Sequence, residues 1–67
     1  MIMKANDVIS ITRKDGYSAY VMIKKIQYPF IAVKFTDGKQ DIINPRHHRL
    51  KLIESDVDEI EFKLKYG

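Results

Sequence analysis

The sequence contains no cysteine among its 67 residues. Disulfide bonds and thiolate metal sites are therefore excluded, and the absence fits a reducing compartment. A domain of this size buries only about 60% of the surface that its unfolded chain exposes. Small domains without covalent or metal cross-links often gain stability from a partner subunit. We therefore expect a single domain that self-associates.

Glycine, proline and long apolar runs are also scarce. The three glycines, Gly16, Gly38 and Gly67, do not form a glycine-rich phosphate loop. No apolar run approaches the roughly 20 residues of a membrane-spanning helix, and residues 1–4 are too short a start for a signal peptide. We expect a soluble cytoplasmic protein with no membrane partner. The abundance of Ile and Lys, together with the small size, suggests a bacterial source.

Catalytic and metal-binding patterns are missing as well. The serines lack the flanking glycines of a nucleophile elbow. The pair His47-His48 has no carboxylate or third histidine at metal-ligand spacing. Adjacent side chains of an extended chain point to opposite sides, so these two rings do not converge on one ion. We expect a protein that is not an enzyme, with no catalytic residues, no metal and no cofactor.

Charge is unevenly distributed along the chain, whose net charge is +3. Residues 13–51 contain nine Lys or Arg and three acids, which gives +6, whereas residues 54–67 contain five acids and two lysines, which gives −3. A basic central region attracts phosphates or an acidic protein surface. Alternatively, the acidic C-terminal segment neutralises that region within the chain or across a dimer.

Alternation of apolar and polar residues is the dominant structural signal. Two Asp-Gly pairs, which begin at Asp15 and Asp37, suit two-residue hairpin turns because glycine accepts a positive φ. Pro29 and Pro45 interrupt pairing because proline has no N–H to donate. The pattern predicts strands at 8–13, 18–26, 30–36, 39–43 and 50–53, with a short helical turn or loop at 45–49.

The C-terminal segment permits two interpretations. Four apolar residues alternate there with charged ones, which is typical of a strand with one apolar face. A helix is the rival interpretation, because Asp58 stands at capping-box spacing from Ser55 and because Glu and Lys form helices readily. We predict the strand, since a helix would scatter the four side chains around its axis. We also expect these four to lie at a homodimer contact: Ile60, Phe62, Leu64 and Tyr66.

Five short antiparallel strands joined by tight turns resemble an SH3-like small β-barrel of the Tudor or KOW type over residues 6–54. The segment Val33-Lys34-Phe35-Thr36-Asp37-Gly38 is similar to a strand and turn that are common in those domains. The resemblance implies an all-β fold. Residues 55–67 then form a C-terminal extension of the same domain and contribute the additional strand.

Basic and aromatic residues form the predicted binding surface. Exposed aromatic rings give a protein partner a large contact area, whereas cations combined with stacking rings suit single-stranded nucleic acid. We predict a non-enzymatic protein-interaction module, such as an adaptor, assembly factor or inhibitor, with nucleic-acid binding as the alternative. The predicted binding residues are Tyr17, Tyr20, Lys24, Lys25, Tyr28, Phe30, Lys34, Arg46, His47, His48 and Arg49.

Overall fold

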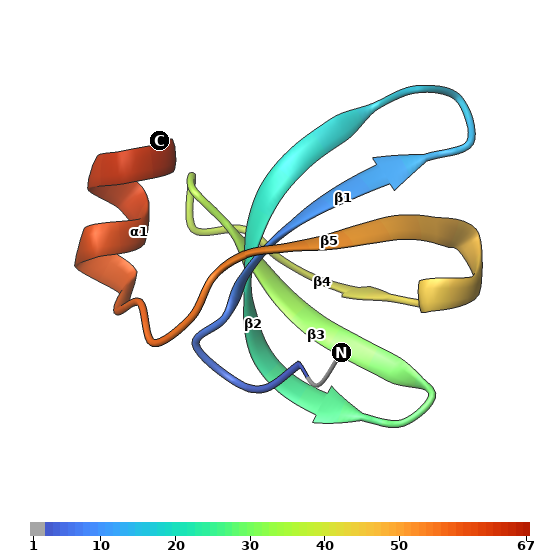
Figure 1. The fold of residues 1–67 in the computed structure, drawn as a ribbon, viewed down its shortest axis with the longest axis horizontal. Coiled ribbons are helices and arrows are strands. Elements are labelled where there is room, and N and C mark those ends of the chain that lie inside the picture. Colours follow the sequence, from blue (N-terminus) through green and yellow to red (C-terminus); the bar gives the residue numbers. More distant parts are fainter. Residues whose placement is uncertain (1–2) are drawn as a thin grey trace.

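The structure, a computed structural model, describes residues 3–67. Over these residues five strands form one antiparallel sheet in the order β4-β3-β2-β1-β5, which confirms the all-β fold (Figure 1). The elements are β1 (Val8–Arg13), β2 (Ser18–Gln27), β3 (Phe30–Phe35), β4 (Gln40–Ile43), the 3-10 turn η1 (Pro45–His47), β5 (His48–Glu54) and α1 (Glu59–Tyr66).

The sheet is curled, but it does not close into the predicted barrel. In the part of the chain that the structure describes, no ladder of hydrogen bonds joins the edge strands β4 and β5. The curl comes from β2, which pairs with β1 along residues 18–22 and with β3 along residues 21–27. A register shift between Ile23 and Lys25 marks a β-bulge, and bulges bend a strand and increase its twist.

Both Asp-Gly loops have the same geometry, which differs from the predicted two-residue turn. The Arg13 N–H donates to the Tyr17 carbonyl at 2.8 Å, and the Gly16 N–H donates to the Arg13 carbonyl at 3.0 Å. These bonds enclose a three-residue loop with Gly16 at a φ of 93°. The Asp15 side chain accepts from the Tyr17 N–H and so stabilises the turn locally. The loop around Gly38 repeats all these contacts.

The inner face of the curled sheet holds the larger core. Strand alternation in β2 and β3 correctly predicts which side chains point inward, because successive residues of a strand face opposite sides. The buried members are Ile9, Ile11, Val21, Ile23, Ile31, Val33 and Ile43, and Ala19, Leu50 and Leu52 pack against them.

The predicted C-terminal strand is wrong, because residues Glu59–Tyr66 form the helix α1. Asp58 caps the helix, and its side chain accepts from the Glu61 N–H at 2.8 Å. This bond satisfies one of the N–H groups that have no partner in the first turn. Acidic residues in the first turn and lysines in the last also favour the helix through its dipole. The rival interpretation, a helix, was therefore correct in type, but the helix is capped by Asp58 and does not begin at Ser55.

The helix covers part of the outer face of the sheet and gives the molecule a second, smaller core. Phe62 is buried there with Val8, Met22 and Val57, and Tyr66 packs beside them. Phe62 and Tyr66 lie one helical turn apart and thus face the same side. The alternation of apolar and charged residues in this segment wrongly predicted a strand with one apolar face, because only two of its four apolar residues face the sheet. Ile60 and Leu64 lie on the opposite side and are 74% and 80% exposed.

Candidate functional site

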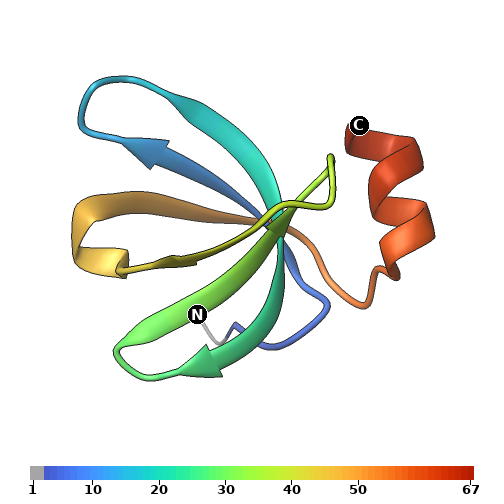
Figure 2. The ribbon, with the colours of Figure 1, turned by 180° about the vertical axis from the view of Figure 1, so that it is seen from behind.

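The predicted binding residues fall into three regions of the structure. One region surrounds η1 and the β1–β2 loop, a second surrounds the β2–β3 turn, and the third lies under α1. Figures 1 and 2 both show the β1–β2 loop, η1 and the β2–β3 turn at one end of the sheet, with α1 at the other end. The predicted binding residues are therefore divided between two ends of the molecule.

The first region is a groove of about 350 Å³ between the β1–β2 loop and η1. We call it the cationic groove, because six of its eight lining residues are Arg, Lys or His and, among the described residues, no carboxylate lines it. The lining residues are Thr12, Arg13, Lys14, Gly16, Arg46, His47, His48 and Arg49.

Backbone pairing assembles this groove from two distant segments. β5 lies antiparallel to β1, so that His48 pairs with Arg13 and Arg49 pairs with Thr12. The turn before β5 is held by Asn44, whose side chain accepts from the Arg46 N–H at 3.0 Å. Pro45 follows at the first position of the turn, where its fixed φ suits a helical start. The strand register and the capped turn together bring Arg46 near the β1–β2 loop.

Most cations of the cationic groove are free to meet a ligand. Arg13 is the exception, because it binds Asp15 at 2.7 Å and its guanidinium lies 4.8 Å from the centre of the Tyr17 ring. The Arg13 guanidinium holds the pKa of Asp15 below its usual value. Within residues 3–67 no carboxylate forms an ion pair with Lys14, Arg46 or Arg49. The groove thus carries an excess of positive charge that attracts anions.

Arg13 and Lys14 are the charged members of this groove that the sequence prediction of binding residues missed. Only the antiparallel pairing of β5 with β1, which the sequence pattern did not predict, brings the beginning of β5 next to the end of β1. The outward positions of β5, β1 and β2 carry hydrogen-bond donors beside this groove. Arg49 pairs across to Thr12, and Lys51 pairs across to Ser10, which pairs in turn with Tyr20.

The second region is a groove of about 350 Å³ between the β2–β3 turn and η1. We call it the apolar groove. The groove is lined by Met3, Ile26, Tyr28, Pro29, Phe30, Ile31, Pro45 and Leu50. Tyr28 is 92% exposed, and Phe30 is about half exposed. Two of the four aromatic residues that the sequence proposes as binding residues, Tyr28 and Phe30, therefore line the same groove.

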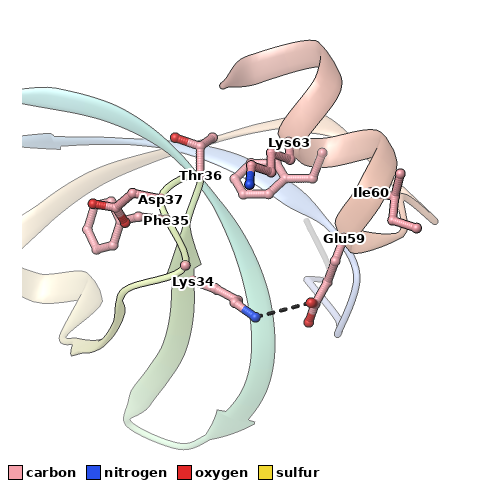
Figure 3. A pocket seen from close by; sticks show the side chains of 9 residues that line it. Lys34, Phe35, Thr36, Asp37, Glu59, Ile60 and Lys63 are labelled. Atoms are coloured by element: carbon pink, nitrogen blue, oxygen red, sulfur yellow. Dashed lines mark hydrogen bonds and ion pairs between the residues drawn. The ribbon is translucent and has the colours of Figure 1, made fainter.

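The third region lies between α1 and the β3–β4 loop, where a hollow of about 260 Å³ is lined by both elements. Lys34 and Glu59 point toward one another across it (Figure 3) and lie 3.1 Å apart. Lys24 binds the same carboxylate. The hydrogen bonds from Lys24 and then Lys34 lower the pKa of Glu59. The acidic tail thus neutralises part of the basic region within the chain, as one of the sequence alternatives proposed.

Tyr20 is also engaged by the helix. Its ring lies against that of Tyr66, whose hydroxyl donates to Glu54 at 2.9 Å. Lys65 binds the same carboxylate at 2.8 Å. These two donors, with Lys65 the stronger influence, lower the pKa of Glu54. Tyr20, Lys24 and Lys34 therefore hold α1 in place, whereas Lys25 lies at the edge of the β2–β3 surface beside Phe30.

Metal and membrane sites have no counterpart in the described residues. Within residues 3–67 no three His, Cys, Asp or Glu side chains gather closely enough to hold a metal ion. No helix in that range has the length and apolar character needed to cross a membrane. The comparisons with protein-family models, with curated proteins and with solved structures gave no match to this chain.

Proposed function

We propose that this domain is a non-enzymatic module that binds nucleic acid, with the cationic groove in contact with the phosphate backbone. The observation that carries the proposal is the gathering of Lys14, Arg46 and Arg49 around one groove, without a carboxylate partner for any of them among residues 3–67. Arginine forks match phosphate oxygens in two parallel hydrogen bonds. The carboxylates of the C-terminal segment lie at the opposite end and leave this groove to an external anion.

Salt dependence tests this proposal directly. Each phosphate contact contributes about 0.7 to 0.9 to the slope of log affinity against log salt. We expect Arg46→Ala/Arg49→Ala to lower that slope by roughly 1.4 to 1.8 in fluorescence anisotropy with labelled oligonucleotides between about 50 and 200 mM salt. The matched control is Lys39→Ala/Lys63→Ala, which removes the same charge near α1. Affinity that does not change with salt, or an equal effect of both double variants, contradicts the proposal.

Protein recognition is the second candidate, and the exposure of Tyr28 favours it. Aromatic side chains that stand in solvent beside an apolar floor are typical anchors of protein interfaces. This candidate predicts capture of one defined protein that persists after nuclease treatment. Such capture should be lost in Tyr28→Ala/Phe30→Ala and retained in Arg46→Ala/Arg49→Ala. Nucleic-acid binding predicts instead that Arg46→Ala/Arg49→Ala weakens binding.

A homodimer also belongs to the proposal, with a narrower contact than the sequence suggests. Phe62 is buried within the chain and Tyr66 packs beside it, so only Ile60 and Leu64 of the four expected residues remain free for a second copy. They stand one helical turn apart and form a short apolar stripe on the exposed side of α1.

A further inference from the structure

The cationic groove and the apolar groove lie on the two sides of one short segment. Pro45 lines the apolar groove and the next residue, Arg46, lines the cationic groove. Farther along, Arg49 lines the cationic groove and Leu50 lines the apolar one. Consecutive Cα atoms are only 3.8 Å apart. A ligand that crosses η1 therefore meets both surfaces within the span of a few residues.

Figures 1 and 2 show the same relationship from opposite sides, with η1 between the β1–β2 loop and the β2–β3 turn. Both grooves open at this end of the sheet, and α1 covers neither. Lys25 lies on the opposite face of the sheet, where it pairs with Ala32 and lines a small hollow with Phe30. An occupant of the apolar groove thus meets positive charge on its η1 side, from the cationic groove.

The chemistry of the two grooves selects one kind of occupant. A ligand that fills both has to carry negative charge and a flat apolar group close together. Each nucleotide of a single strand carries both, because its phosphate and its unpaired base are joined through one sugar. Bases stack on Tyr and Phe rings with little regard to sequence. A duplex offers the phosphates but keeps the faces of its bases inside the stack.

We propose that the two grooves form one continuous site for single-stranded nucleic acid. The phosphates lie along Arg46, Arg49 and Lys14, and an unpaired base enters the apolar groove against Tyr28 and Phe30. This inference rests on the proposed nucleic-acid binding and adds a preference for single strands over duplexes, together with the residues that produce it. Tyr28 and Phe30 produce the preference for single strands over duplexes, whereas the arginines bind the phosphates of either form.

The test compares a labelled oligothymidylate of about 12 nucleotides with a duplex of the same length, which is within the usual range of small-domain sites. We expect tighter binding of the single strand. Tyr28→Ala/Phe30→Ala should weaken single-strand binding by about fivefold or more, since each stacked base contributes at least that much, and should leave duplex binding within about twofold of the original. Tyr28→Trp keeps a stacking face and should preserve single-strand affinity.

The outcomes separate this inference from the proposed function. Binding to neither oligonucleotide overturns both. Equal binding of single strand and duplex, with no effect of the aromatic variant, overturns the inference and leaves phosphate binding in place. A third outcome is a protein that is captured after nuclease treatment only when Tyr28 and Phe30 are present, combined with single-strand binding that does not need them. This outcome assigns the apolar groove to a protein and also overturns the inference. Tyr28 is almost fully exposed, so its loss does not unfold the domain.

Discussion

The ring of Tyr66 in α1 lies against the ring of Tyr20 in β2, with the ring centres 5.0 Å apart and the planes at 43°. Aromatic pairs at this separation prefer tilted or offset arrangements. Phe62, one turn earlier, lies 5.8 Å from Tyr66 and fills the space between the helix and the sheet. An eight-residue helix is too short to be stable alone in water. These aromatic contacts therefore help to keep α1 folded, together with the ion pairs that Glu59 and Lys65 form with the sheet.

Substitutions in α1 should have very unequal effects on stability. Phe62→Ala removes a buried ring and should lower the free energy of unfolding by about 3 to 5 kcal/mol. Leu64→Ala, on the exposed side of the helix, should change it by less than about 0.5 kcal/mol. Urea unfolding followed by circular dichroism measures both. Equal losses would indicate that both side chains are buried, as in the strand that the sequence first suggested.

Asp7 and Asp56 form a matched pair for a test of burial. Both bind the ammonium group of Lys4, but the Asp7 side chain is 1% exposed whereas that of Asp56 is 83% exposed. Asp7 also accepts from the Lys4 N–H at 3.0 Å. Asp7→Asn should lower the free energy of unfolding by about 1 to 3 kcal/mol, because it replaces a buried acceptor with a donor. Asp56→Asn should change stability little. Similar results for the two variants would argue against burial as the cause.

Acid should destabilise the fold through four carboxylates, one of which is Asp15, whose pKa is lowered by Arg13. Burial raises the pKa of Asp7, but its hydrogen bonds from Lys4 outweigh burial and leave that pKa lowered. The pKa values of Glu54 and Glu59 are lowered by their lysine partners. A carboxyl whose pKa is lower in the folded state stabilises the fold above its unfolded pKa of about 4, and this contribution is lost as the pH falls through the folded pKa.

The free energy of unfolding should therefore remain nearly constant from pH 7 to about 5 and decrease at lower pH. Chemical unfolding at a series of pH values measures this dependence. Glu54→Gln/Glu59→Gln should show a shallower decrease, because two of the four linked carboxylates no longer titrate. A variant whose stability falls as steeply as that of the parent chain would assign the acid sensitivity to other groups.

Self-association should depend on the exposed side of α1. Sedimentation at high micromolar concentration should detect a dimer of the parent chain and a monomer of Ile60→Lys/Leu64→Lys. Because both positions are exposed, the variant should keep the unfolding behaviour of the parent. A parent chain that stays monomeric at these concentrations would rule out the dimer, and a variant that still dimerises would assign the contact to another surface.

Much of the fold could be predicted because alternation is a local property. The bounds of β1 match the prediction, and those of β2, β3 and β4 differ from it by one residue. β5 is longer than predicted by two residues at its beginning and by one at its end. His48 and Arg49 belong to it because they pair with β1, and such pairing is a long-range property. Strand positions follow from neighbouring residues, whereas strand ends depend on partners elsewhere in the chain.

The candidate site was predictable only in part, for the same reason. The loop that contains Arg46, His47, His48 and Arg49 was identifiable from its composition, and so were the exposed aromatic residues. Their grouping was not, because β1–β5 pairing brings Arg13 and Lys14 to the loop. The role of Lys24 and Lys34 also depended on the position of α1, which directs Glu59 toward both.

The sequence alone determined the all-β character, the inward faces of the strands, the Asp-Gly loops and the separation of a basic centre from an acidic tail. Each of these depends on residue chemistry over a few neighbouring positions. Tertiary structure decided which cations the acidic tail neutralises and which cations stay free around η1. It also decided which apolar side chains of α1 are buried. Those outcomes depend on contacts between segments far apart in the chain, and only the packed molecule determines them.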